Sequence, residues 1–121
     1  MSKKILVADD EKDALLMLKT RLSNAGYEVI LAQSGEEAVK KAKEKQPNLI
    51  ILDIVMQGMD GAEAAKVLEA NYLTSSIPII FLSCLIRKGE EEGVRDQKDR
   101  YYMAKPYSPE KLLSVIEERI R

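Results

Sequence analysis

Short continuous apolar runs alternate along the chain with longer segments in which apolar residues recur every three or four positions. The runs are too continuous for half-exposed strands, so they predict strands buried on both faces over residues 4–8, 27–32, 48–53, 77–83 and 101–104. The periodic segments predict helices over residues 11–25, 34–45, 60–71, 87–97 and 108–121. Five strands alternating with five helices predict an α/β fold, a doubly wound parallel sheet in the order 2-1-3-4-5.

Polar residues stand where four of the predicted strands end. Asp9 and Asp10 follow the first strand, Asp53 closes the third, Ser83 closes the fourth and Lys105 follows the fifth. Parallel strands bring these ends to one edge of the sheet, where open α/β sheets bind ligands. Two close carboxylates repel by roughly 4 kcal/mol at an effective dielectric of 20, so three of them call for a cation. Oxygen ligands alone favour a hard ion, Mg²⁺ or Mn²⁺.

Composition and charge exclude several classes of function. The chain has 121 residues, which fits one domain spanning 1–121. Its 19 basic and 20 acidic residues give no positive field, so direct binding of nucleic acid is not expected. We find neither a membrane-spanning run nor a signal peptide and expect a cytoplasmic location without membrane binding. The sequence has no histidine for a catalytic triad and a single cysteine, Cys84, which we expect to be a small core residue.

The motifs around these strand ends resemble those of the receiver domain of two-component response regulators. They are VADDE, IILDIVM, MDG, FLSC and YYMAKPYS, and the resemblance extends from Lys4 to about Ile120. It implies a flavodoxin-like single domain of the chemotaxis-regulator kind. It also implies a phosphoprotein that takes a phosphoryl group from a histidine kinase or a histidine phosphotransfer protein. Such a domain catalyses only its own phosphorylation and dephosphorylation, so we do not expect an enzyme.

The resemblance assigns a role to each candidate site residue. Asp53 is the phosphoacceptor, and Asp9, Asp10, Asp53 and the main-chain carbonyl of Val55 bind Mg²⁺. Ser83 and Lys105 contact the phosphoryl oxygens. Tyr102 is the aromatic residue that changes rotamer when Ser83 moves. The fourth helix, fifth strand and fifth helix then form the face that an unknown downstream partner reads.

Some residues depart from the family pattern. Gln57 stands where proline is usual, which predicts a less rigid loop after Asp53, and Cys84 replaces a smaller residue beside Ser83. Lys98 and Asp99 replace a common Gly-Ala pair, so the shape of the readout face is open.

The residues two positions after Asp53 and Ser83 are also unusual. Val55 and Leu85 lack polar groups that would position a hydrolytic water, which predicts a long-lived phosphoryl state.

Helix one carries consecutive apolar residues at 14–18, which cannot all share one inward stripe. Either an apolar patch is exposed beside the site, suited to a helical kinase domain, or the helix buries a wide face.

Simpler interpretations remain for each residue alone. An Asp-Asp pair is more often a helix N-cap and an exposed acid, and a single strand-end acid, hydroxyl or lysine usually has no special role. A phosphohydrolase with an aspartyl-phosphate intermediate would usually need an acid at Val55, and a flavodoxin-like cofactor carrier would need a glycine-rich loop in place of ADDEKD. A degenerate receiver that serves only as a protein-interaction module is the main alternative.

Overall fold

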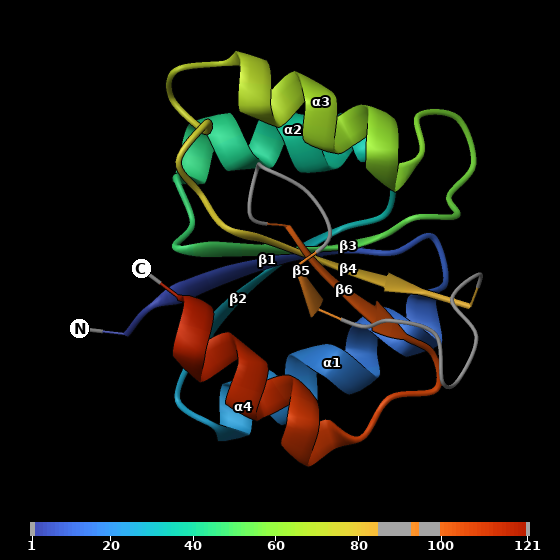
Figure 1. Ribbon diagram of the computed structural model, residues 1–121, viewed down its shortest axis with the longest axis vertical. Coiled ribbons are helices and arrows are strands. Elements are labelled where there is room, and N and C mark those ends of the chain that lie inside the picture. Colours follow the sequence, from blue (N-terminus) through green and yellow to red (C-terminus); the bar gives the residue numbers. More distant parts are fainter. Residues whose placement is uncertain (1, 85–92, 95–99, 121) are drawn as a thin grey trace.

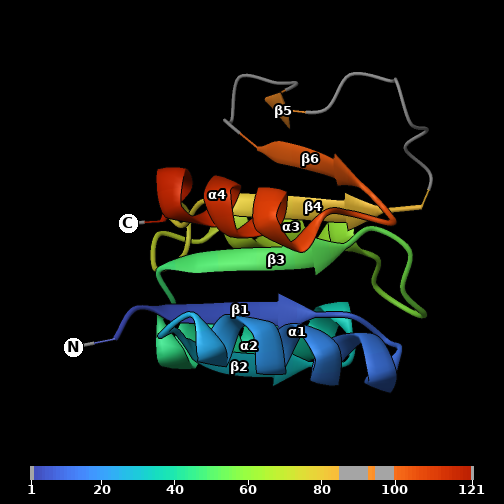
Figure 2. The same cartoon turned by 90° about the horizontal axis from the view of Figure 1, so that it is seen from below.

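The computed structural model describes residues 2–84, 93–94 and 100–120 of the chain, and Figure 1 shows a central sheet between two layers of helices. Five strands are parallel in the order β2-β1-β3-β4-β6, and they are β1 (Lys4–Ala8), β2 (Glu28–Ala32), β3 (Leu49–Asp53), β4 (Ile79–Ser83) and β6 (Tyr101–Ala104). The described residues hold four helices, which are α1 (Lys12–Asn24), α2 (Gly35–Lys45), α3 (Gly61–Ala70) and α4 (Pro109–Arg119). Helices α2 and α3 cover one face, and α1 and α4 cover the other (Figures 1 and 2).

The predicted strand order is confirmed, but the edge of the sheet differs from the prediction. A two-residue strand, β5 (Gly93–Val94), pairs antiparallel with β6 and adds a sixth strand at the edge. The helix predicted over residues 87–97 is therefore wrong at these two positions, and the rest of it lies outside the described residues. A charged, glycine-interrupted segment gave that helix weak support from the start.

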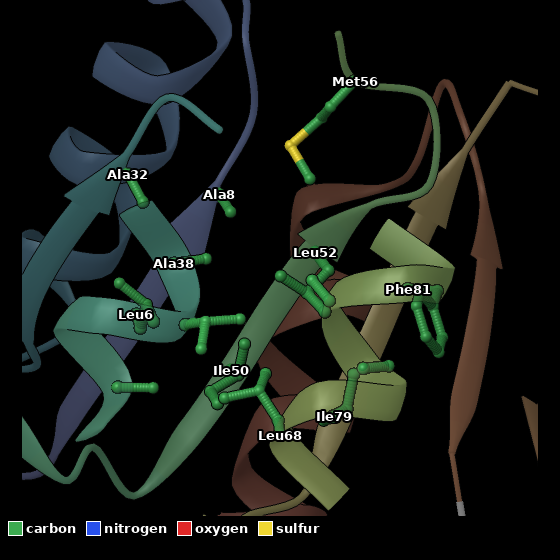
Figure 3. Close-up of a cluster of buried hydrophobic side chains, with 14 residues drawn as sticks. Leu6, Ala8, Ala32, Ala38, Ile50, Leu52, Met56, Leu68, Ile79 and Phe81 are labelled. Carbon is green, nitrogen blue, oxygen red and sulfur yellow. The ribbon is translucent and has the colours of Figure 1, made fainter. Parts of the chain in front are cut away.

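Two hydrophobic clusters, one on each face, hold the helices to the sheet. Side chains of alternating strand residues go to opposite faces, so β1 sends Leu6 toward α2 and α3, and Ile5 and Val7 toward α1 and α4. Figure 3 shows the first cluster, with Leu6, Ile50, Leu52, Ile79 and Phe81 lying between strands and helices. Strand β3 lies between β1 and β4, and each of its residues is buried, including Asp53 at its end.

Side-chain caps begin three of the helices where the sequence predicted. In α2, α3 and α4 the N-cap side chain accepts a hydrogen bond from a main-chain N–H three residues on, and the caps are Ser34, Asp60 and Ser108. Helix α1 has no such cap, because its N-cap is Glu11 and neither Asp9 nor Asp10 plays that part. The N-cap part of the simpler interpretation of the Asp-Asp pair is therefore wrong, whereas Asp10 is the exposed acid that it expects.

The outer face of α1 carries two large apolar side chains. Leu15, Leu18 and Leu22 are buried, whereas Leu16 and Met17 are each 55% exposed. Residues 14–18 therefore include an exposed apolar patch, and the helix does not bury a wide face. In the described part of the chain, no helix combines the length and apolar character needed to cross a membrane.

Candidate functional site

Asp53 ends the buried central strand and lies at the carboxyl edge of the sheet. Asp53 is only 9% exposed. The main-chain N–H of Val55 donates to Asp53 Oδ1 at 3.1 Å, so a turn two residues long fixes the carboxylate to its own loop. Gly61 makes this turn possible, because a Cβ there would lie 2.3 Å from the carbonyl oxygen of Asp53.

Lys105 joins Asp53 to Asp9 across the edge of the sheet. Its Nζ lies 2.9 Å from Asp53 Oδ2 and 3.0 Å from Asp9 Oδ2. Asp9, which is 3% exposed, is held in the same way as Asp53, because the N–H of Glu11 donates to its Oδ1 at 3.0 Å. In each buried acid, one carboxylate oxygen thus accepts a hydrogen bond from the main-chain N–H two residues later in the sequence. The other oxygen accepts one from the ammonium group that the two acids share.

Burial and charge act in opposite directions on this cluster. Burial raises the pKa of the Asp53 carboxyl, while its hydrogen bond and charge interaction with Lys105 lower it and the nearby Asp9 raises it. Burial lowers the pKa of Lys105, but its hydrogen bonds to Asp53 and Asp9 outweigh that effect, and the pKa is raised. The ammonium form of Lys105 is therefore the form that the site stabilises.

Asp10 and Ser83 lie at the same edge, each in a different environment. Asp10 is exposed, and its Oδ2 accepts a hydrogen bond from the main-chain N–H of Gln57 at 3.2 Å. Ser83 is fully buried at the end of β4, where its carbonyl oxygen accepts from the main-chain N–H of Lys105 at 3.0 Å. Five of the predicted site residues therefore meet at one edge of the sheet, and they are Asp9, Asp10, Asp53, Ser83 and Lys105.

The donor set suits a hard cation, although the acids are not drawn together as a formed metal site. Among the described residues, no group of three or more His, Cys, Asp or Glu side chains is arranged to hold a metal ion. Lys105 supplies positive charge between Asp9 and Asp53, while Asp10 is directed to the neighbouring loop. Carboxylate oxygens from two adjacent loops are the ligands that Mg²⁺ and Mn²⁺ prefer. The carbonyl of Val55 as a ligand stays a prediction.

Tyr102 lies in β6 next to Phe81 of β4, apart from the acidic edge. The two rings stack with their centroids 4.9 Å apart. A residue that the sequence analysis missed, Arg100, lies over the Phe81 ring, hydrogen-bonds to Tyr102 and pairs with Glu69 of α3, with Nε 2.9 Å from Oε2. No sequence pattern links Glu69 to Arg100, because the fold alone brings these distant positions together.

Cys84 is exposed, so its prediction as a small core residue is wrong. Strand β4 ends at Ser83, and the following residue no longer points into either cluster. Cys84 instead lines a cavity of about 470 Å³ between α1 and the segment after β6, together with Asp9, Met17, Arg21, Lys105 and Tyr107. This cavity therefore reaches Asp9 and Lys105, one of the bridged acids and the bridging lysine.

Comparison with known proteins agrees with the geometry. The strand order and the lysine-bridged acidic edge define the class as a doubly wound α/β domain with its functional site at the switch point. The family model for the response regulator receiver domain matches residues 5–117, and the chain belongs to this family. It is therefore the receiver domain of a two-component response regulator, a phosphoacceptor signalling switch.

Individual relatives extend this assignment. The chain is 38% identical to the alkaline phosphatase synthesis transcriptional regulatory protein PhoP of Bacillus subtilis, covering 100% of this chain and 50% of that protein. It spans about half the length of the first curated relatives that it matches. The chemotaxis protein CheY4 of Vibrio cholerae has a TM-score of 0.85 at 28% identity, with 99% of this chain and 100% of that one covered.

A third neighbour shows the fold alone. The receiver domain of the sensor histidine kinase PA1611 from Pseudomonas aeruginosa has a TM-score of 0.82 at 24% identity, with 98% of each chain covered, and its structure holds magnesium in the active site cleft.

Proposed function

We propose that Asp53 of this receiver domain accepts a phosphoryl group from a phosphohistidine, on a histidine kinase or a histidine phosphotransfer protein, in a reaction that requires Mg²⁺. The observation that carries the proposal is the position of Lys105, whose ammonium lies 2.9 Å from the buried carboxylate of Asp53. A strand-end acid with an ammonium already beside it is suited to receive a group that brings negative charge.

The transfer forms one bond and breaks another. A carboxylate oxygen of Asp53 attacks phosphorus, the P–N bond to the histidine ring breaks, and the ring nitrogen leaves with the bonding electron pair. The product is an acyl phosphate. Lys105 neutralises part of the charge on the transferred oxygens, and Ser83 contacts another of them. Asp9, Asp10, Asp53 and the Val55 carbonyl are the groups we expect to hold Mg²⁺, or Mn²⁺ in its place, which would supply the remaining positive charge.

The readout begins with the same residues. A phosphoryl group adds nearly two negative charges at one point, which alters the partners of Lys105 and draws the hydroxyl of Ser83. Tyr102, stacked on Phe81, is the aromatic side chain whose position we expect to change in response. The surface of β6 and α4, with the segment predicted as the fourth helix, is then read by a downstream partner.

Helix α1 offers the docking surface for the phosphodonor protein. Its exposed Met17 lines the cavity that reaches Asp9 and Lys105, and the exposed Leu16 is the residue before it on the helix. Two exposed apolar side chains on a helix beside the site fit a helical partner that must bring its histidine to Asp53. We infer that the chain acts on its own Asp53 and is not an enzyme for other substrates.

The test is intact mass after incubation with acetyl phosphate and Mg²⁺. We expect the mass of one phosphoryl group to be gained by the parent chain, and no gain in Asp53→Asn or without divalent cation. No gain in the parent, with divalent binding established separately, would contradict the proposal and favour a degenerate receiver that acts only as an interaction module.

A further inference from the structure

A main-chain hydrogen bond joins the two loops that carry the acids of the site. The N–H of Gln57, in the loop after β3, donates to Oδ2 of Asp10, in the loop after β1, over 3.2 Å. The two residues are 47 positions apart in sequence. Through this hydrogen bond the loop after β3 contacts Asp10, the exposed member of the Asp9–Asp10 pair.

The fold fixes the direction of the Gln57 N–H. Met56, the residue before it, is 7% exposed and directs its side chain back toward the strands (Figure 3). Gly58, the residue after it, has a φ of 73°, a conformation that turns the loop and that glycine adopts readily. Further on, the N–H of Gly61 donates to the Ile54 carbonyl at 3.0 Å and closes the loop. The donor is therefore held by a buried anchor and a turn.

Among the described residues, the Asp10 carboxylate has no second hydrogen bond or ion pair that holds it. Asp10 is exposed, in contrast to Asp9, which has both oxygens engaged inside the fold. An exposed aspartate on a loop samples several rotamers, and ordering it when a ligand binds costs free energy. A hydrogen bond to one carboxylate oxygen restricts these rotamers and leaves the other oxygen available.

We propose that the main-chain N–H of Gln57 is a positioning donor that orients Asp10 toward a divalent cation. The inference rests on the proposed function, in which Asp10 is a cation ligand. It assigns the role to the main chain of residue 57 and gives none to the Gln57 side chain. Proline, which the family resemblance leads one to expect here, has no N–H and cannot make this contact. Partners that orient metal ligands commonly influence affinity in this way.

A double-mutant cycle tests the proposal with four proteins, the parent, Gln57→Pro, Asp10→Ala and the double variant. Each is titrated with Mn²⁺ without phosphodonor, and free Mn²⁺ is measured by electron paramagnetic resonance. We expect Gln57→Pro to weaken binding by about three- to tenfold, less than for a buried supporting partner because the contact is exposed. In the Asp10→Ala background the proline should have no further effect. Gln57→Ala, which keeps the N–H, should bind within about twofold of the parent.

Several results would overturn the inference. Unchanged or tighter binding by Gln57→Pro would refute it, as would an equal loss in Gln57→Ala. A loss that persists in the Asp10→Ala background would show that proline acts by stiffening the loop. A parent that binds no Mn²⁺ would refute the proposed cation site as well, so the two failures are distinguishable.

Amide hydrogen exchange gives a second measurement that does not depend on the proline variant folding. In the parent the Gln57 N–H should exchange more slowly than in Asp10→Ala, while amides of the β3 core keep the same protection. Equal exchange of the Gln57 amide in both proteins would refute the hydrogen bond.

Discussion

Replacement of Lys105 by methionine should destabilise the protein, because it removes the cation shared by two buried acids. Asp9 and Asp53 are 3% and 9% exposed. Removing one partner of a buried ion pair typically costs about 3–5 kcal/mol, since the other charge remains without compensation. The lysine side chain is 25% exposed, so water screens part of the interaction. We therefore expect the free energy of unfolding to fall by about 2–4 kcal/mol at pH 7. Methionine keeps most of the apolar stem, which limits any loss of packing.

The pH dependence identifies the cause. The pKa of Lys105 is raised, so its contribution to stability is complete below the ordinary lysine pKa and is lost as pH rises through the folded value. Without Lys105, the pKa of Asp53 should rise further, because burial and the nearby Asp9 still raise it while the lowering effect of Lys105 is lost. The penalty of Lys105→Met should thus grow as pH rises through the acid range. It should shrink toward about pH 3, where Asp53 is protonated and no longer needs the cation.

The assay is thermal and urea unfolding of Lys105→Met, the parent and Lys66→Met between pH 3 and pH 7. Lys66 is an exposed lysine of α3, so its variant controls for the lost charge and should change stability by less than about 0.5 kcal/mol. For a domain of this size the expected loss lowers the melting temperature by about 10 °C at pH 7. Equal stability of Lys105→Met and the control at pH 7, or a penalty that persists at pH 3, would refute the ion-pair argument.

Three further predictions concern the loop, the docking face and the phosphoryl state. Gly61→Ala should cost about 1–3 kcal/mol of unfolding free energy and slow phosphorylation, because its Cβ would lie 2.3 Å from the Asp53 carbonyl oxygen; a normal urea midpoint would contradict this. Leu16→Glu should slow transfer from a cognate kinase by about tenfold and leave acetyl phosphate labelling unchanged, and loss of both would indicate a structural role. The phosphoryl group should last for minutes, because Val55 offers no polar group to position a hydrolytic water. Intact mass at intervals after removal of the donor measures this lifetime, and loss within seconds would count against the prediction.

Most of the fold could be predicted because the pattern that forms it is local. Strand β1 matches its prediction at both ends, since its apolar residues 5–8 stand between the charged residues Lys4 and Asp9. The packing of α3 was less predictable. Helical spacing groups Val67 with Ala64 and Leu68, yet Val67 is 37% exposed, because the buried stripe runs through Ala64, Ala65 and Leu68. The spacing of apolar residues predicts the buried face of a helix to within about one residue. Only packing against the sheet decides how the helix is finally rotated about its axis.

The residues of the site could be predicted, but most of their contacts could not. Strand-end positions place Asp9, Asp53 and Lys105 at one edge by topology alone. The distances that make Lys105 a bridge depend on rotamers and loop geometry. The same applies to the pairing of Glu69 with Arg100, which joins α3 to the strand of Tyr102 and has no sequence signal.

The arrangement of the acidic edge links its stability to its proposed activity. Three carboxylates and one ammonium leave a net excess of negative charge at a largely buried edge, and burial raises the pKa of Asp53. A core built for stability alone would not place an acid at the end of its central strand. Lys105 offsets this by serving two acids with one charge, so any new negative group on Asp53 must compete with Asp9 for it. Phosphorylation would thus change the contacts of Lys105, after β6, and of Asp9, after β1, at the same time. The proposed switch therefore depends on how Lys105 divides its charge between the two acids.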